Sequence, residues 1–149
     1  MAANLTLVSA VEGLNRKDLP LADRTLTHPS NANPLVEGEW LEYDGNKKAI
    51  RSGGAALSWV VWAEKGRSDI QALGKVPVLY MGAYEADTLV FTATSLALGS
   101  PLKVDNVTFE SLTRSGLVLH AGGSDLVVGY VTRLPAVNGQ KLRFIQTLV

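Results

Sequence analysis

The sequence predicts a mainly β protein, a small antiparallel β-barrel or sandwich preceded by an extended N-terminal arm. Two observations indicate the β class. Short runs rich in Val, Leu and aromatic residues recur through the last third of the chain, and Gly-Gly, Asn-Gly and Pro separate them. Such punctuation is typical of strands joined by tight turns. The runs are residues 99–105, 117–120, 126–133 and 142–149.

Residues 1–35 are predicted to form the arm. Residues 19–34 contain three prolines and no sustained hydrophobic period, and proline holds itself and its predecessor in extended conformations. Residues 4–8 also have the composition of a short strand. The region is too apolar for a solvated disordered tail, so we expect it to lie on its own domain or on a neighbour and to serve attachment more than folding. The leucines expected to make these contacts are Leu5, Leu7, Leu19, Leu21 and Leu26.

The β domain is predicted to span residues 36–149 and to open with a hairpin. Residues 36–43 and 47–51 are strand-like, and Asp44-Gly45-Asn46 separates them. Asp-Gly between two such runs is a strong hairpin signal, because the primed turns that match strand twist need positive φ.

Residues 55–64 are apolar on every side, which fits a buried helix segment as well as a buried strand. Two β-branched residues and two tryptophans within four positions favour the strand. Trp59 and Trp62 are three residues apart, so in a strand they face opposite sides. One of them would fill the core and the other would need a cover.

The next segments are predicted from their start and stop signals. Residues 66–74 resemble a loop with one helical turn, with Ser68 as N-cap and Gly74 as terminator. Residues 75–81 are strand-like, and Pro77 implies an edge strand or a strand start. Residues 84–91 indicate a further strand, while residues 93–98 favour no single element.

The predicted last strand is largely apolar on both faces. Alternate residues from 142 to 149 face opposite sides, and each side carries apolar residues. A strand of this kind lies between a core and a second layer or another chain. We therefore expect self-association, with Phe144 among the contact residues.

Composition narrows the function classes. The chain of 149 residues has a formal net charge of zero, so it lacks the electrostatic signature of a general nucleic-acid binder. Its charged share of 19% is below the roughly 25% of typical domains and suits a surface partly covered by partners. Without cysteine there is no disulfide, thiolate site or cysteine nucleophile.

The sequence predicts no membrane association. The first residues lack a basic region followed by an apolar one, and no apolar run approaches the ~18 residues that span a bilayer. We expect a protein that stays in the cytoplasm or in a particle assembled there.

No catalytic constellation is predicted. The only histidines are His28 and His120. A triad of Ser124, His120 and Asp125 is conceivable, but a triad serine normally sits on a constrained elbow. Gly123-Ser124-Asp125 is instead typical of a hairpin turn.

The carboxylates before the first hairpin turn also have a simple interpretation. Glu37 and Glu39 share a predicted strand face, as a glycosidase pair would, but a solvated strand face is the commoner explanation. No histidines or carboxylates have metal-ligand spacing, and no glycine pair is followed by the lysine of a phosphate loop. We therefore expect no enzyme activity, metal or cofactor.

The aromatic residues suggest one alternative function. A five-stranded barrel with surface aromatics can stack single-stranded nucleic acid. The aromatics concerned are Trp40, Tyr43, Trp59, Trp62, Tyr80 and Tyr84, and the cations nearby in sequence are Lys47, Lys48 and Arg51. The neutral balance favours core or interface roles instead, and Trp40 and Trp62 are counted among the candidate partner contacts.

Three segments carry a family resemblance. Residues 98–105, 127–135 and 142–145 resemble the closing part of small β-rich head decoration (cement) proteins of tailed bacteriophages. Residues 36–41 and the following hairpin are similar to their opening strand. The likeness covers residues 36–149 and rests on strand and turn patterns; the arm and residues 59–74 have no counterpart.

The resemblance implies a virion protein without catalytic residues. Such a protein binds the outside of the major capsid protein shell as a dimer or trimer and clamps neighbouring capsomers, after assembly in the host cytoplasm. Tail tube or tail completion proteins share these sequence traits and are alternatives in the same class. A single-strand-binding barrel and a small hydrolase are the alternatives from other classes.

Overall fold

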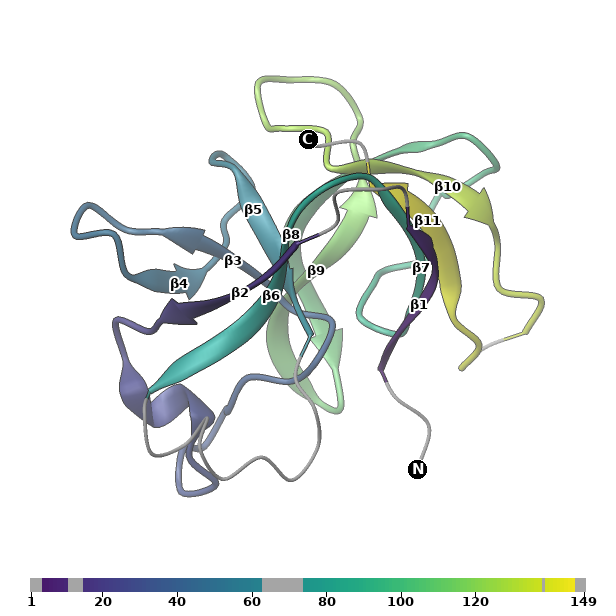
Figure 1. Ribbon diagram of the computed structural model, residues 1–149. Helices are drawn as coiled ribbons and strands as arrows, with labels where there is room; N and C mark the ends of the chain where they lie inside the picture. Colours follow the sequence, from purple (N-terminus) through teal and green to yellow (C-terminus); the bar gives the residue numbers. More distant parts are fainter. Residues whose placement is uncertain (1–3, 11–14, 63–73, 138, 147–149) are drawn as a thin grey trace.

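The computed structural model describes residues 4–10, 15–62, 74–137 and 139–146. Its strands form two antiparallel sheets that pack face to face (Figure 1). The predicted mainly β class is confirmed. Of the two predicted architectures the sandwich fits, because neither sheet closes into a barrel.

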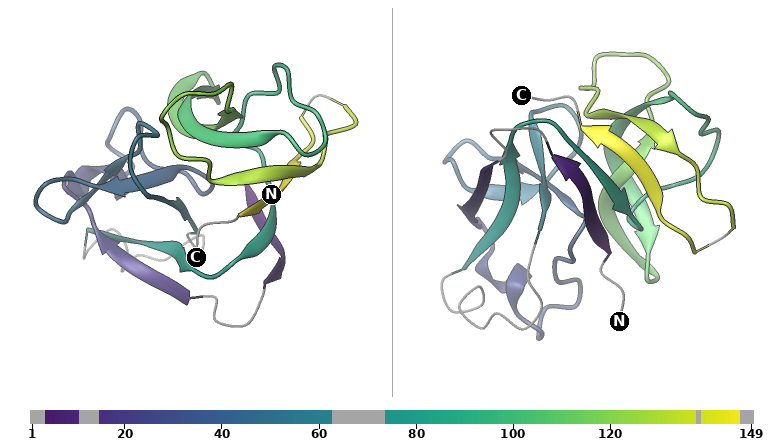
Figure 2. Two further views of the ribbon diagram at one scale, coloured as in Figure 1. Left: turned by 90° about the horizontal axis from the view of Figure 1, so that it is seen from above. Right: turned by 45° about the vertical axis from the view of Figure 1, so that its right-hand side comes forward.

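The six-stranded sheet contains most of the last third of the chain (Figure 2, right). Its strands, in spatial order, are β1 (Leu5–Ala10), β7 (Tyr84–Thr88), β11 (Leu142–Gln146), β10 (Gly129–Arg133), β8 (Pro101–Phe109) and β9 (Leu112–Leu119). Strands β8 and β9 form its longest hairpin, paired from Leu102 and Leu119 to Phe109 and Leu112.

The five-stranded sheet contains most of the first half. Its strands, in spatial order, are β2 (Asn15–Pro20), β6 (Lys75–Met81), β5 (Ser58–Val61), β3 (Trp40–Tyr43) and β4 (Ala49–Arg51). A short 3-10 helix, η1 (Arg24–Thr27), follows β2. The Asp23 carboxylate accepts a hydrogen bond from the Thr25 N–H and caps this helix.

The two sheets share a bent two-stranded ribbon. Strand β1 pairs with β7 in one sheet, and β2 pairs with β6 in the other. The chain runs directly from β6 into β7 (Figure 1). Strand β1 therefore belongs to the six-stranded sheet and strand β2 to the five-stranded sheet.

The predicted N-terminal arm is not confirmed. Residues 5–10 and 15–20 are edge strands, and Leu5, Leu19 and Leu21 are buried in the hydrophobic cores. The extended backbone predicted from the prolines is present at the end of β2, where pairing with β6 makes it a β-strand, but η1 and a series of turns and bends follow it. The boundary predicted at residue 36 does not separate the sheets, because β1 and β2 lie on its N-terminal side.

The hairpin of β3 and β4 is confirmed, but the turn differs from the predicted one. Residues 44–48 connect the strands, and the positive φ of 59° belongs to Lys47. The Asp44 carboxylate shapes the turn by accepting hydrogen bonds from the N–H groups of Asn46 (2.8 Å) and Lys48 (2.9 Å). The aspartate, through its side chain, is thus the main determinant of this turn.

Strand β5 confirms the interpretation of the two tryptophans. All four residues of β5 are buried. Trp59 belongs to a core on the far side of the five-stranded sheet, and Trp62 packs against the core between the sheets. The two rings therefore lie on opposite sides of one sheet.

Strand β6 corrects the inference drawn from Pro77. This strand is internal, between β2 and β5. The proline is tolerated because the pairing of β5 ends at Val61, beside Val78, and Pro77 contributes only its carbonyl oxygen, which accepts the Trp62 N–H. The helical turn predicted over residues 66–74 falls, apart from Gly74, outside the described residues.

Strand β11 is also internal, with β7 and β10 as neighbours. Leu142, Phe144 and Gln146 are buried, while Arg143 is partly exposed and Ile145 is exposed. Its outer face is therefore mixed in character and on the surface. The predicted second layer over this face is not present among the described residues.

Candidate protein-binding surface

The predicted partner contacts are mostly core residues. Each of five side chains is at most 2% exposed: Leu5, Leu19, Leu21, Trp40 and Phe144. A side chain buried in its own fold is not available to a partner, so these assignments are wrong. They were made from apolar character alone, which does not distinguish a core from an interface.

The other three predicted contacts are partly buried and belong to different elements. Leu7 and Trp62 pack against the core between the sheets, and Leu26 packs against the core beyond the five-stranded sheet. The Arg16 guanidinium lies 5.4 Å from the centre of the Trp62 ring. These side chains do not form a single surface.

The exposed apolar side chains gather elsewhere. Among the described residues, the exposed large hydrophobic side chains are Val8, Leu57, Leu98, Tyr130, Leu134, Val137 and Ile145. All except Leu57 belong to the six-stranded sheet or to its connecting loops. The exposed apolar side chains are therefore concentrated on one of the two sheets.

The centre of this surface crosses three adjacent strands. Tyr130 on β10 is paired with Ile145 on β11 and with Pro101 on β8. Residues paired across antiparallel strands share a face, so these three side chains form a row on the outer side of the sheet. Tyr130 is 41% exposed and Ile145 is 38% exposed.

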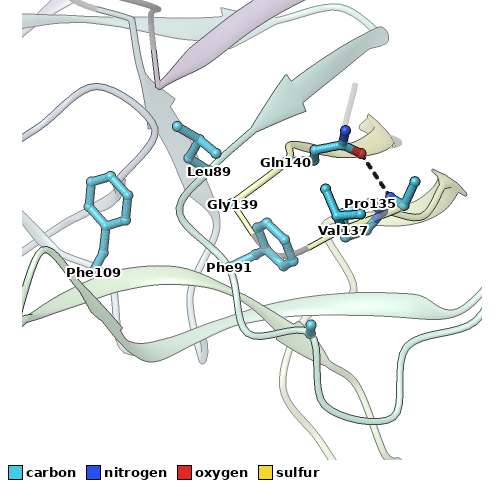
Figure 3. A pocket seen from close by; sticks show the side chains of 9 residues that line it. Leu89, Phe91, Phe109, Pro135, Val137, Gly139 and Gln140 are labelled. Carbon is cyan, nitrogen blue, oxygen red and sulfur yellow. Dashed lines mark hydrogen bonds between the residues drawn. The ribbon is translucent and has the colours of Figure 1, made fainter.

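A hollow of about 400 Å³ lies at one end of the same sheet (Figure 3). Leu89 and Phe91, which follow β7, form one wall, and the loop between β10 and β11 forms the other. Phe109, the last residue of β8, lies at the far end (Figure 3). The full lining is Leu89, Phe91, Ala93, Phe109, Pro135, Ala136, Val137, Gly139 and Gln140.

Both walls are held by hydrogen bonds that involve the backbone. In the loop, Gln140 accepts the Ala136 N–H through its Oε1 atom (3.0 Å), and its own N–H donates to the Val137 carbonyl oxygen (3.2 Å). In the other wall, Leu117 of β9 donates to Val90 and accepts from Thr92. The hollow is therefore bounded by anchored segments.

A second hollow of about 530 Å³ adjoins the first and has charged residues in its lining. The two share Leu89, Ala136, Gly139 and Gln140. The second is also lined by Asp87, Arg133, Leu134 and Lys141.

The charged residues of the second hollow include an ion pair network. Arg143 donates to both Asp87 carboxylate oxygens, at 2.8 Å from Nε and 3.1 Å from Nη2, and Arg133 lies 3.5 Å from the same carboxylate. The hydrogen bonds from Arg143 lower the pKa of Asp87. Lys141 Nζ donates to the Thr6 hydroxyl group at 2.7 Å. Both Arg133 and Lys141 thus present positive charge at the hollow.

The residues of the considered triad do not form one. One ring nitrogen of His120, Nε2, lies 2.7 Å from the Asp125 carbonyl oxygen, and the other accepts the Gly122 N–H. The Asp125 carboxylate pairs with Lys103. Gly122 and Gly123 each have a φ of 101°, but the hairpin turn predicted at Gly123-Ser124-Asp125 is wrong, because residues 120–128 connect β9 to β10 and both strands pair with β8 rather than with each other. Within the described residues, no three His, Asp or Glu side chains are grouped as metal ligands would be.

Glu39 corrects the prediction of a solvated carboxylate face. Its side chain is fully buried and accepts hydrogen bonds from Arg51 (2.9 Å) and from the Val36 N–H (2.9 Å). Glu37 accepts the Leu5 N–H at 3.1 Å. The two carboxylates therefore hold neighbouring chain segments, which is a structural function.

The structure brings three of the aromatic residues together. Trp59 stacks on Tyr80 with ring centres 5.0 Å apart, and Tyr43 packs edge-on against Trp59 at 4.8 Å. Lys17 Nζ lies 4.4 Å from the centre of the Tyr80 ring. Of the cations predicted to accompany such a row, Arg51 is engaged with Glu39 instead.

Comparison of the chain with protein-family models, with curated proteins and with solved structures found no match. Over the described ranges, no helix has the length and apolar character needed to cross a bilayer.

Proposed function

We propose that the protein is a structural component of a bacteriophage virion. In this proposal it binds the outer surface of the capsid shell as a dimer or trimer and stabilises contacts between major capsid proteins. The observation that carries the proposal is the concentration of exposed apolar side chains on the six-stranded sheet. A surface of this kind is suited to stable contact with protein.

The family resemblance supports the same surface. Three of the segments that resemble decoration proteins correspond to β8, β10 and β11, which are adjacent strands of the six-stranded sheet, while residues 36–41 and the following hairpin belong to the five-stranded sheet. The row of Pro101, Tyr130 and Ile145 crosses these strands. A stable protein interface buries about 1,200–2,000 Å² in total, and a sheet face together with its loops is a natural unit of that size.

The test is binding to capsids that lack the protein. The purified chain is mixed with undecorated capsids, and the fraction that sediments with them is measured for the wild type and for Ile145→Asp. The proposal predicts saturable binding that Ile145→Asp strongly weakens. Leu57→Asp is the matched control, because Leu57 is similarly exposed (46%) and lies outside the six-stranded sheet.

Two results would contradict the proposal. One is the absence of wild-type protein from sedimented capsids even at high protein concentration. The other is equal binding of capsids by Ile145→Asp and Leu57→Asp. Light scattering at about 50 μM, a concentration where ordinary interfaces form, tests the oligomer separately. A monomer there would remove the self-association from the proposal.

A second candidate function is binding of single-stranded nucleic acid, favoured by the row of Lys17, Tyr80, Trp59 and Tyr43, in which the rings of Tyr80 and Tyr43 are partly exposed and Trp59 is the buried support between them. The row crosses four strands of the five-stranded sheet. Stacking of bases on such rings is worth about 1–3 kcal/mol per base. Titration with oligo-dT at physiological salt, followed by tryptophan fluorescence, tests it: submicromolar binding that Tyr80→Ala abolishes would favour this function over the structural one.

A further inference from the structure

We propose that the two adjoining hollows bind one extended peptide segment of a partner protein, in which a bulky apolar side chain is followed by a carboxylate. The partner is the capsid protein if the function proposed above holds, and to that extent the inference rests on it. The geometry of the hollows points to this ligand on its own.

The first hollow supplies the apolar part of the site. Leu89, Phe91 and Phe109 are half-buried, and Val137 is 61% exposed at the rim. Its volume of about 400 Å³ lies within the roughly 300–1,000 Å³ of ligand sites. An aliphatic or aromatic side chain seated there removes apolar surface of both partners from water.

The second hollow supplies the charge. Its lining contains Arg133 and Lys141 against the single carboxylate of Asp87. The Asp87 carboxylate already accepts hydrogen bonds from Nε and Nη2 of Arg143. The Arg133 side chain is 56% exposed. Glu85 lies on β7, two residues before Asp87, where it is paired with Ile145 and is not part of the lining. The charge that faces the hollow is therefore positive, and it favours a carboxylate over an ammonium group.

The connection between the hollows decides the shape of the ligand. They share Leu89, Ala136, Gly139 and Gln140, so the apolar part and the charged part meet at these four residues, and we infer from this contact that they form one depression. An extended peptide places successive side chains at regular spacing along such a depression. A nucleic-acid strand would require several cations along the track, whereas this depression has two.

The test uses fluorescein-labelled hexapeptides and fluorescence anisotropy. The probe peptide is Gly-Leu-Phe-Asp-Glu-Gly, and the two comparison peptides replace either Asp-Glu by Lys-Lys or Leu-Phe by Ala-Ala. The wild-type protein is expected to bind the probe saturably below about 1 mM, the affinity of short linear segments. Both comparison peptides are expected to bind at least tenfold more weakly, and the acidic probe is expected to weaken as salt is raised.

Variants assign the two parts of the site. Arg133→Glu is expected to weaken binding of the probe peptide roughly tenfold or more, which is the scale of one charge-assisted hydrogen bond. The same substitution is expected to strengthen binding of the Lys-Lys peptide. Val137→Asp is expected to weaken binding of the probe peptide as well. Lys48→Glu and Leu57→Asp are the matched controls, because both residues are exposed and lie outside the six-stranded sheet. Circular dichroism verifies that each variant is folded.

The outcomes separate this inference from the proposed function. No saturable binding of the probe, or equal binding by Arg133→Glu, Val137→Asp and their controls, would overturn the peptide site. Peptide binding with the expected variant pattern supports the site even if capsids are not bound. Capsid binding that persists unchanged in the double variant Arg133→Glu/Val137→Asp would overturn the site as a capsid contact and leave the proposed function intact.

Discussion

Arg114 Nη1 lies 3.5 Å from Glu39 Oε2, and both side chains are buried. Arg114 belongs to β9 in one sheet, and Glu39 directly precedes β3 in the other. Arg114 also donates to the Pro34 carbonyl oxygen, and Glu39 accepts from Arg51 on β4. This network fastens residues 34–39 between the two sheets.

Loss of one partner from this network is expected to be costly. Glu39→Ala leaves two guanidinium groups without their carboxylate, and removal of one member of a buried ion pair typically costs about 3–5 kcal/mol. Urea unfolding at neutral pH measures the change in the free energy of unfolding. The matched control is Asp105→Asn, which removes an exposed ion pair with Lys103 at 3.9 Å and is expected to cost less than about 1 kcal/mol. Similar small losses for both variants would show that the network contributes little.

The ion pair of Asp87 and Arg143 is expected to make stability depend on pH below neutrality. The pKa of Asp87 in the folded protein is lowered from its ordinary value of 3.8, chiefly by the hydrogen bonds from Arg143. A lowered carboxyl pKa adds stability that is present above pH 3.8 and is lost as the pH falls through the folded-state pKa. We expect the Asp87→Asn variant to have a lower thermal unfolding temperature than the wild type at pH 7. Near pH 2 we expect the difference between the two unfolding temperatures to be smaller. An unchanged difference at the two pH values would contradict this.

The N-terminal strands are expected to be required for folding. Leu19 on β2 is fully buried, and truncation of a buried leucine to alanine costs about 2–5 kcal/mol. We therefore expect Leu19→Ala to lower the free energy of unfolding by that amount. Val8→Ala on β1 is the control, because Val8 is 38% exposed and exposed substitutions usually stay within about 0.5 kcal/mol. Equal stability of the two variants would restore the idea of a detachable arm.

The sequence predicted the β elements well because strand identity is a local property. Alternation, β-branched residues and turn signals lie within a few positions of each other, and they located β3 to β7, β10 and β11 to within about four residues. The long hairpin was predicted only in part, as residues 99–105 of β8 and 117–120 of β9. Strand β1 was indicated by the composition of residues 4–8. Strand β2 was missed because an extended segment becomes a strand only through its partner, and that partner is β6, which pairs Leu19 with Val76 far along the chain.

The candidate site was not predictable in the same way. Leu89, Phe109 and Val137 are far apart in sequence and meet only at the end of the six-stranded sheet. No spacing rule links them, just as none links Glu39 to Arg114. A local signal was present only in the loop, where Pro135 and Gly139 indicate a turn. Apolar character alone selected core residues such as Phe144 as contacts.

Gly116 on β9 is expected to be essential for the wall that carries Leu89 and Phe91. A Cβ atom at this position would lie 2.6 Å from the Val90 carbonyl oxygen and 2.7 Å from a methyl group of Val107. The Val90 oxygen accepts the Leu117 N–H, and this hydrogen bond holds the oxygen in its place beside Gly116. Gly116→Ala is therefore expected to destabilise the fold by about 1–3 kcal/mol, the usual cost of overpacking.

The same substitution is expected to disturb the hollow. Displacement of Val90 shifts the segment between Leu89 and Phe91, so probe-peptide binding should weaken in protein that is still folded at low temperature. Gly53→Ala is the matched control, because a Cβ atom there meets nothing within 4 Å and Gly53 is not among the positive-φ glycines. Urea unfolding and peptide anisotropy measure both effects. If Gly116→Ala matches Gly53→Ala in both measurements, the close approach of β9 to residue 90 does not constrain the wall.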